Sequence, residues 1–404
     1  DGNHLEESGG DGGMKWEKKK LCECTEYITD GDHQPAPKAD KGVHFIKIKD
    51  IVNNQVSFDA QVYVPQEYYD NLPMERKPQK EDVLYTVVGS FGIPSYVQTD
   101  ELFCFERNIA LLHPNKDIEP RFLYYSLKNP AFYKGVEIVA NGSAQKLIPL
   151  SKLKDLKILV PDKEAQRHIA DILSAYDDLI ENNQRQIKLL EEAAQRLYKE
   201  WFVDLRFPGH ENTKIVDGVP EGWNEKTLSQ VANVIMGQSP KSEFYNSEKK
   251  GLPFHQGVGS YGVRFVMDDI YSTSYTRIAE PNSILFSVRA PVGRLNITKN
   301  KVVIGRGLAA INQTDGCQSY LYYLLKNKFF KDNIVGNGSI FASVSKDELL
   351  NQKFLIPERN LMMQFEKIVS QMDKQIENLD SKNKKLIEAR DRLLPKLMSG
   401  EVEV

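Results

Sequence analysis

The chain has 404 residues, of which 41% are hydrophobic and 27% charged, which suits two or three domains that each bury a core. No apolar run reaches the roughly 20 residues of a membrane span, no secretory signal opens the chain, and Cys22, Cys24, Cys104 and Cys317 form no disulfide or zinc pattern, so we expect a cytoplasmic protein. Residues 221–357 carry sixteen Lys and Arg against eleven Asp and Glu, whereas residues 14–161 carry twenty of each, so the second region favours an anionic partner or has a mildly basic solvated surface.

Residues 1–13 precede Met14 and contain four acidic residues but no Lys or Arg. We expect them to be an added leader that takes no part in the fold. A native acidic tail is the alternative.

Residues 14–161 are predicted to form a mixed α/β domain with many short strands. The segments Val43-His-Phe-Ile-Lys-Ile and Val83-Leu-Tyr-Thr-Val-Val are rich in β-branched and aromatic residues and are bounded by turn residues. Residues 120–134 are predicted to form a short helix, whose aromatic side chains we expect in the core and not on a base-stacking surface.

Residues 162–205 are predicted to form a long helix, because Asp162 can cap its start and no Gly or Pro follows until Pro208. Its apolar positions alternate in steps of four and three residues, which is typical of a coiled coil. These positions are Ile169, Leu173, Tyr176, Ile180, Asn183, Ile187, Leu190, Ala194 and Leu197.

Residues 206–357 are predicted to form a second mixed domain, with strands at 283–288 and 302–304 and a helix at 318–332. The segment Gly257-Val-Gly-Ser-Tyr-Gly262 fits G-x-G-x-x-G, but a dinucleotide site needs a helix after it. Residues 263–267 are strand-like instead, so we expect a flexible glycine loop followed by a strand.

Residues 358–404 are predicted to form a second long helix with the same spacing. Its apolar positions are Phe365, Val369, Met372, Ile376, Leu379, Asn383, Leu386, Arg390, Leu393 and Leu397.

The chain is a tandem duplication. FLYYSLKN at 122–129 returns as YLYYLLKN at 320–327, and Asn141-Gly-Ser, predicted to be a tight turn, returns as Asn337-Gly-Ser. Leu159-Val-Pro161 returns as Leu355-Ile-Pro357. An ordered series at nearly constant spacing indicates a repeated unit with a globular part followed by a helix.

The regularly spaced positions of each long helix form a seam along one face, and each seam contains a single asparagine. These two asparagines predict how the helices pair. If the helices run antiparallel with Asn183 facing Asn383, every seam residue faces another seam residue. In this register Tyr176 faces Arg390 and Ile187 faces Leu379. Facing amides can hydrogen-bond and fix the register, whereas a lone buried amide costs stability. The alternative is two helices that pack only on their own domains.

Several segments resemble those of the specificity subunits (HsdS) of type I restriction–modification systems. In the second domain these are Gly222-Trp223-x4-Leu228-x2-Val231-x3-Ile235-x-Gly237-Gln-Ser-Pro240, Pro253-Phe-His-Gln256-Gly257, Arg289-Ala-Pro-Val-Gly293 and Ile304-Gly-Arg-Gly307. The others are Thr29-Asp-Gly-Asp-His33-x-Pro35, Pro161-x4-Gln166-x2-Ile169, Leu197-x3-Trp201-Phe202 with Phe207-Pro208, and Leu394-Pro395-x-Leu397-Met-Ser-Gly400. The resemblance covers residues 14–404.

This resemblance implies an α+β protein with two similar target-recognition domains, at 14–161 and 206–357, separated by two long helices in an antiparallel coiled coil. The helices form a central region at 162–205 and a distal region at 358–404. Each domain would read one half of a split sequence in double-stranded DNA, and the coiled coil would space the halves and dock two methyltransferase subunits. S-adenosylmethionine would belong to those subunits, and ATP and Mg to a restriction subunit, so this chain would be non-catalytic and hold no cofactor or metal.

The resemblance also implies which loops contact DNA. Candidates in the first domain are Asp32, His33, Gln145 and Lys146, and candidates in the second are Gln238, Ser239, Gln256, Arg289, Arg306 and Asn337. Arg can pair with guanine and Asn or Gln with adenine, and we expect about half of these candidates to be phosphate contacts or structural residues. His255 lies in a matched loop as well, where a structural contact is an equally good interpretation.

Catalytic motifs are not found in the sequence. It contains no G-x-x-x-x-G-K-[ST] and no Pro-Pro, which argues against a nucleoside-triphosphate site and an amino-methyltransferase site. Two alternative functions remain: the recognition module of a single-chain modification enzyme, and a helical scaffold with no DNA role.

Overall fold

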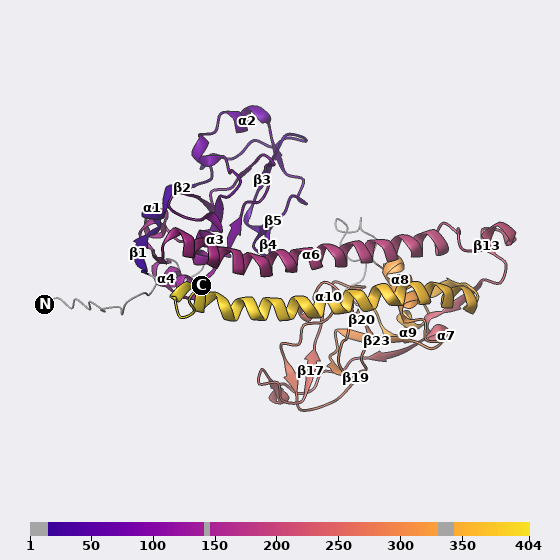
Figure 1. The fold of residues 1–404 in the computed structure, drawn as a ribbon. Coiled ribbons are helices and arrows are strands. Elements are labelled where there is room, and N and C mark those ends of the chain that lie inside the picture. Colours follow the sequence, from indigo (N-terminus) through magenta and orange to yellow (C-terminus); the bar gives the residue numbers. More distant parts are fainter. Residues whose placement is uncertain (1–14, 141–145, 330–342) are drawn as a thin grey trace. The chain divides into compact units, whose positions relative to one another are not determined.

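The computed structural model describes residues 15–140, 146–329 and 343–404 (Figure 1). The chain divides into two compact units, of which unit 1 comprises residues 1–183 and 381–404 and unit 2 comprises residues 184–380. The two long helices, α6 (Lys163–Phe202) and α10 (Arg359–Ser399), each contribute one part to each unit. Each unit is therefore a globular part packed with a stretch of both helices.

Unit 1 contains a four-stranded antiparallel sheet in the order β2-β10-β7-β8 and a three-stranded sheet in the order β6-β3-β9, where β3 and β9 run parallel. Its strands include β1 (Glu17–Lys20), β2 (Thr25–Asp30), β3 (Val43–Ile46), β4 (Ile51–Val52), β5 (Gln55–Val56), β6 (Tyr63–Val64), β7 (Val83–Thr86), β8 (Pro94–Tyr96), β9 (Phe103–Phe105), β10 (Ile109–Pro114) and β11 (Lys157–Val160). Its short helices include α1 (Leu21–Cys24), α2 (Gln66–Asp70), α3 (Pro120–Lys128), α4 (Pro130–Val139) and α5 (Leu150–Asp155).

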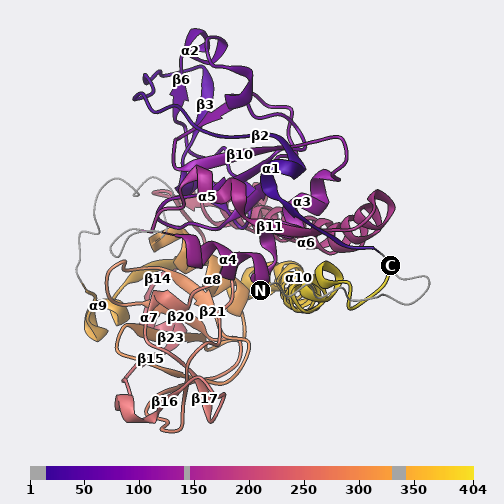
Figure 2. The ribbon, with the colours of Figure 1, turned by 90° about the vertical axis from the view of Figure 1, so that its left-hand side faces the viewer.

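Unit 2 contains a four-stranded antiparallel sheet in the order β15-β23-β20-β21, labelled in Figure 2, and a five-stranded sheet in the order β16-β18-β17-β22-β19. Its strands include β12 (Ile215–Val216), β13 (Val219–Pro220), β14 (Asn224–Thr227), β15 (Ala232–Met236), β16 (Tyr245–Asn246), β17 (Leu252–His255), β18 (Tyr271–Ser272), β19 (Ile278–Ala279), β20 (Ile284–Ser287), β21 (Leu295–Ile297), β22 (Val302–Ile304), β23 (Leu308–Gln313) and β24 (Lys353–Ile356). Its short helices include α7 (Leu228–Val231), α8 (Gln318–Phe329) and α9 (Lys346–Leu350).

The two globular parts repeat the same topology, which confirms the predicted duplication. In chain order, the last strand of each main sheet pairs with the first and the second strand, in both β2-β10-β7-β8 and β15-β23-β20-β21. The parallel pair β3 and β9 has its counterpart in β17 and β22, which also run parallel.

The predicted strands fall at the expected places and end slightly earlier than predicted, except that β22 matches its predicted range. The helix predicted at 120–134 was wrong as a single element, because the chain breaks between α3 and α4. Asn129 leaves the helical conformation before Pro130 and caps α4, since its side chain accepts the Ala131 amide at 3.1 Å. The aromatic residues of α3 and α8 are buried as predicted, among them Phe122, Tyr125, Tyr320 and Tyr323.

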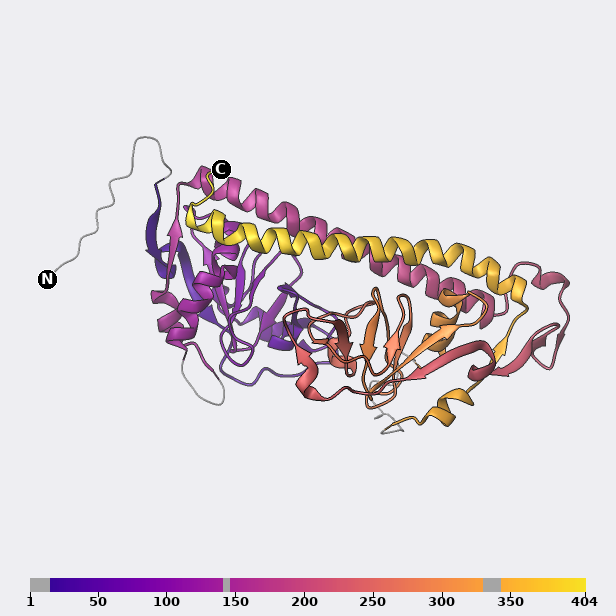
Figure 3. The same ribbon diagram turned by 90° about the horizontal axis from the view of Figure 1, so that it is seen from below.

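The long helices follow the predicted seam. Asp162 caps α6, because its Oδ1 accepts the Ala165 amide at 2.9 Å. All nine predicted seam positions of α6 and all ten of α10 are buried or half-buried, whereas Leu179 and Leu189, which lie off the seam, are exposed. The helices α6 (magenta) and α10 (yellow) run side by side in Figures 1 and 3.

Candidate functional site

Three turns of unit 2 meet at one end of its sheets. They follow β15, follow β17 and connect β22 to β23. The Ser239 hydroxyl donates to Gln256 Oε1 at 2.7 Å and accepts the Arg306 amide at 3.2 Å. The Gln238 amide donates to the Ile304 carbonyl at 2.9 Å. The structure thus brings four predicted DNA-contact residues (Gln238, Ser239, Gln256 and Arg306) into one surface, the unit 2 turn cluster.

Arginine side chains border this cluster. Arg289 follows β20, where the Val288 amide donates to the Gly307 carbonyl at 2.9 Å. Arg277 precedes β19, and its carbonyl accepts the Ile304 amide at 2.9 Å. The side chains of Arg277, Arg289 and Arg306 are exposed and make no hydrogen bond or ion pair with another residue in the described ranges. Such guanidinium groups can bind phosphate or a guanine edge.

His255 is a buried residue of strand β17 and not of a loop, so of its two interpretations the structural contact is confirmed. Its ring is 0% exposed, with Nδ1 2.9 Å from Ser260 Oγ and Nε2 3.2 Å from Asp268 Oδ1. Both ring nitrogens are therefore occupied within unit 2, and the side chain holds the glycine loop in place.

The predicted residues of unit 1 lie beside the turn after β2. Asp32 accepts the Tyr68 hydroxyl at 3.0 Å, Arg76 Nη1 at 3.2 Å and the Gln34 amide at 3.2 Å. Although burial opposes the charge, these hydrogen bonds and Arg76 hold the pKa of Asp32 below its ordinary value. His33 is more exposed, at 62%, and its Nε2 lies 3.1 Å from Asp30.

Lys146 lies near this turn region through its backbone, because its carbonyl accepts the Gly89 amide at 3.3 Å. Its ammonium lies 3.8 Å from Glu137 and 5.3 Å from the centre of the Phe91 ring. Gln145 and Asn337 lie outside the described residues, as do both predicted Asn-Gly-Ser turns.

The turn between β9 and β10 repeats the backbone of the turn between β22 and β23. The Ile109 amide donates to the Glu106 carbonyl at 3.1 Å, as Leu308 does to Gly305 at 3.0 Å. The Val87 amide donates to the Asn108 carbonyl at 2.9 Å, matching Val288 and Gly307. Arg107 therefore takes the place of Arg306. The sequence prediction missed Arg107, although Arg107-x-Ile-Ala and Arg306-x-Leu-Ala are a usable signal.

In each unit, a glycine in the turn after β2 or β15 lets that turn closely approach the turn before β10 or β23. A Cβ on Gly31 would lie 2.2 Å from the Phe105 carbonyl oxygen, and a Cβ on Gly237 would lie 2.1 Å from that of Gly305. Both distances are far below van der Waals contact, so only glycine fits. The unit 1 turn cluster (residues 30–33, 87–89, 106–108 and 146–148) is thus assembled in the same way as that of unit 2.

The segment after the glycine loop of unit 2 differs from the prediction. Residues 263–267 form only isolated bridges, Tyr261 with Val266 and Phe265 with Ile297, so the predicted strand was wrong. In this segment the Arg264 side chain is 2% exposed and lies 3.4 Å from Glu191 and 2.5 Å from Asp373. The Arg264 guanidinium also lies 3.9 Å from the centre of the Tyr322 ring. Burial opposes the charge, but Tyr322, Tyr323 and the two acids keep the pKa of Arg264 above its ordinary value.

The helix pair of unit 1 is fixed by polar contacts at the predicted register. Asn183 Nδ2 donates to Asn383 Oδ1 at 2.8 Å, and Asn383 Nδ2 donates to the Ile180 carbonyl at 3.4 Å. Asn183 and Asn383 are 9% and 6% exposed, so this confirms the predicted buried amide pair.

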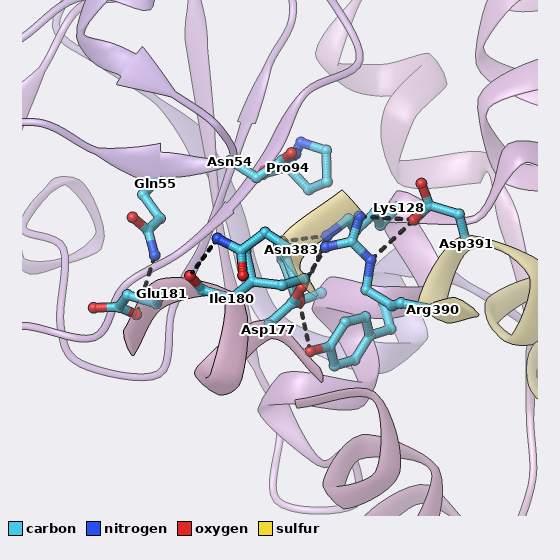
Figure 4. Close-up of polar contacts among 12 residues, drawn as sticks. Asn54, Gln55, Pro94, Lys128, Asp177, Ile180, Glu181, Asn383, Arg390 and Asp391 are labelled. Carbon is cyan, nitrogen blue, oxygen red and sulfur yellow. Dashed lines mark hydrogen bonds and ion pairs between the residues drawn. The ribbon is translucent and has the colours of Figure 1, made fainter. Parts of the chain in front are cut away.

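A cluster of charges accompanies this amide pair (Figure 4). Arg390 was predicted to face Tyr176 and forms an ion pair with the adjacent Asp177. Asp177 also accepts the Tyr125 hydroxyl at 2.8 Å and lies 3.5 Å from Lys128 Nζ. The globular part of unit 1 is thereby joined to both helices.

Metal-ligand clusters and membrane-spanning helices are not found in the described part of the chain. No group of three or more His, Cys, Asp or Glu side chains there could hold a metal ion. No helix in the described ranges is both long and apolar enough to cross a membrane.

Comparisons with known proteins identify the family. The family described as "Type I restriction modification DNA specificity domain" matches residues 14–192 and 220–389. A Methanocaldococcus jannaschii protein assigned as the MjaX specificity subunit of a type I restriction enzyme is 30% identical over 400 residues, which cover 96% of this chain and 94% of that protein. The HindI specificity subunit of Haemophilus influenzae is 25% identical over 444 residues, covering 89% and 94%.

A solved structure has the same fold. The crystal structure of a type I restriction-modification S subunit from M. genitalium matches with a TM-score of 0.61 at 19% identity, covering 96% of this chain and 98% of that one. Because the identity is low, this likeness supports the fold alone. The family match and the relatives together show that this chain belongs to the specificity subunits of type I restriction–modification systems.

Proposed function

We propose that this chain is the non-catalytic DNA-recognition subunit of a type I restriction–modification complex, in which each unit reads one half of a split target. The observation that supports this most is the repeated turn cluster. Two units share one backbone arrangement at the same end of equivalent sheets, but they present different side chains there. This is what two readers of different half-sequences require.

In unit 2, we assign base or phosphate contacts to Gln238, Ser239, Gln256, Arg289, Arg306 and Asn337. Gln can pair with adenine and Arg with guanine in the major groove. In unit 1, we assign Asp32, His33, Gln145 and Lys146. Asp32 is already bound by Arg76 and Tyr68, so of these four it is the one best suited to a structural role.

A gel shift with duplex DNA tests the assignment, with and without a methyltransferase subunit. A DNA-binding subunit gives a shift that weakens with salt, because bound phosphates release counterions. A helical scaffold gives none in either mixture. Arg289→Ala and Arg306→Ala should each cost about 1–3 kcal/mol and relax one base position. Unchanged affinity and sequence preference in both variants would remove these residues from the site.

Independent reading is tested by domain exchange. Replacing residues 14–161 with the equivalent segment of another specificity subunit should change one half of the methylated sequence and leave the other unchanged. Methylation mapping in cells measures this directly. If both halves change together, the units do not read independently.

We further propose that the helix pair spaces the half-sites and docks two methyltransferase subunits, and through them a restriction subunit. S-adenosylmethionine, ATP and Mg would be bound by those partners. Inserting one heptad in each helix keeps the apolar seam and adds about 10 Å, or roughly three base pairs, to the spacer. An unchanged spacer in methylation maps of the insertion variant would refute the spacing role.

A further inference from the structure

Arg107 is an exposed side chain of the unit 1 turn cluster. It lies between Glu106, whose Oε1 accepts the Ile48 amide at 2.8 Å, and Asn108, whose carbonyl accepts the Val87 amide at 2.9 Å. Both neighbours fix the turn, and Arg107 itself is exposed. Across the described residues it has no hydrogen-bond or ion-pair partner within the protein.

Arg107 lines a concave site that contains both polar and apolar side chains. A pocket of about 420 Å³ is lined by Arg107 together with the polar residues Asp30, His33 and Asn108 and the apolar residues Val88 and Leu147. Val88 and Leu147 are held together by an antiparallel bridge, and Leu147 is 43% exposed. Such a surface offers donors for a base edge beside apolar groups that can contact a thymine methyl group.

The repeat supplies the second, independent argument. Arg107 and Arg306 occupy the same position of turns that are closed by the same two backbone hydrogen bonds and approached by Gly31 and Gly237. Other matched positions differ in chemistry, with Asp32 in place of Gln238 at the residue after the glycine and Val88 in place of Arg289. An arginine is therefore the reading group that the two clusters have in common.

We propose that Arg107 contacts a base edge in the half-site read by unit 1, as the counterpart of Arg306 in unit 2. This inference rests on the proposed function. It predicts that one base pair of the first half-site, preferably guanine, depends on Arg107, because the planar guanidinium can donate two parallel hydrogen bonds to guanine O6 and N7.

The experiment uses the full-length chain with its methyltransferase subunits. The probe is duplex DNA carrying the target defined by methylation mapping, together with single-base variants of each half-site. Arg107→Ala should weaken binding to the intact target roughly 5- to 150-fold and abolish discrimination at one base pair of the first half-site. Arg107→Lys retains the charge but lacks the planar fork, so it should lose the same discrimination.

Two matched variants serve as controls. Lys116→Ala removes one positive charge just beyond the other end of strand β10, where Lys116 is exposed, and should leave discrimination unchanged. Arg306→Ala should relax a position of the second half-site only. Unfolding curves establish that all variants fold.

Three results would overturn the inference or its basis, and they can be told apart. If Arg107→Ala binds like the wild type while Arg306→Ala is impaired, the assignment of Arg107 fails and the proposed function stands. If Arg107→Ala weakens binding equally on every sequence, Arg107 contacts phosphate and does not read a base. If the wild-type complex does not distinguish its target from other duplexes, the proposed function itself fails.

Discussion

Units 1 and 2 have nearly the same backbone at their turn clusters and very different side chains. Thr86 donates to the Ser90 carbonyl at 2.7 Å and accepts the Ile93 amide at 2.9 Å. Ser287 does the same with Pro291 at 2.6 Å and Arg294 at 2.8 Å. The hydroxyl groups that shape the turns are thus retained in both units.

The side chains on the turns after β2 and β15 differ between the units. Unit 1 presents Asp32, which is tied to Arg76, whereas unit 2 presents Gln238 with a neutral neighbour, Ser239. The difference shows that local hydrogen bonds and glycine contacts set where a side chain is presented, so its identity can change without altering the fold. The variants below test how far this separation holds, beginning with the largest expected effect.

Arg264 of unit 2 is 2% exposed, whereas Arg390 of unit 1 is 12% exposed, and removing Arg264 should have the largest effect. Arg264→Met leaves Glu191 and Asp373 without their cation, so the unfolding free energy of unit 2 should fall by about 3–5 kcal/mol. Urea unfolding followed by tryptophan fluorescence measures this, since Trp201 and Trp223 both lie in the core of unit 2. Arg277→Met, at an exposed arginine of the same unit, is the control, and an equal effect of both variants would contradict the role of Arg264.

Replacing the glycine that contacts the second turn should lower the free energy of unfolding by the same amount in both units. Gly31→Ala and Gly237→Ala each push a methyl group into a backbone carbonyl, and we expect each to cost about 1–3 kcal/mol. Gly259→Ala is the control, because a Cβ there meets nothing within 4 Å. Thermal unfolding compares the three variants. A large loss in one unit and none in the other would show that the two clusters are not built alike.

The amide pair distinguishes the helix pair of unit 1 from the apolar seam of unit 2. Asn183→Leu leaves the Asn383 amide buried without its main partner, which should cost about 1–3 kcal/mol. Replacing both by Leu should restore or raise stability but loosen the register. Spin labels at exposed positions 182 and 382, after Cys22→Ser, report the register as a distance distribution. A distribution as narrow as that of the wild type would show that the seam alone sets the register.

The smallest effect is expected at Asp32. Asp32→Asn removes the charge that pairs with Arg76, so stability at pH 7 should fall by roughly 0.2–1 kcal/mol. The pKa of Asp32 is lowered in the folded chain, so its contribution is present above the unfolded pKa and is lost as the pH falls through the folded one. The variant and the wild type should therefore converge in urea unfolding as the pH falls through the folded pKa of Asp32. A difference in unfolding free energy that persists at lower pH would have a cause other than the Asp32 charge.

The helices could be predicted in detail because their signal is local and periodic. A 3.5-residue spacing identified every seam position, and one asparagine in each seam was enough to give the register. The break at Asn129 was missed because the aromatic pattern continued across it, although Pro130 was a visible stop signal.

The turn clusters could be predicted only in part, because they depend on contacts far apart in the chain. Arg264 looked like part of a strand, since only its distant partners Glu191 and Asp373 show that the side chain is buried. His255 looked like a loop residue, since nothing local reveals its contact with Asp268. Arg107 was missed because its match with Arg306 has a different offset from the neighbouring repeats.

The seven-residue period of α6 and α10 has a consequence for the angle by which the DNA duplex turns between the two half-sites. One added heptad is about 10 Å, or three base pairs, along B-DNA, and three base pairs turn the duplex by roughly 100°. The helix seam returns to the same face after every heptad, but the grooves of DNA do not. Three added heptads, about 31 Å, bring the duplex back almost one full turn. On the proposed spacing role, one added heptad therefore lengthens the spacer and also requires the DNA to twist, whereas three added heptads require almost no twist.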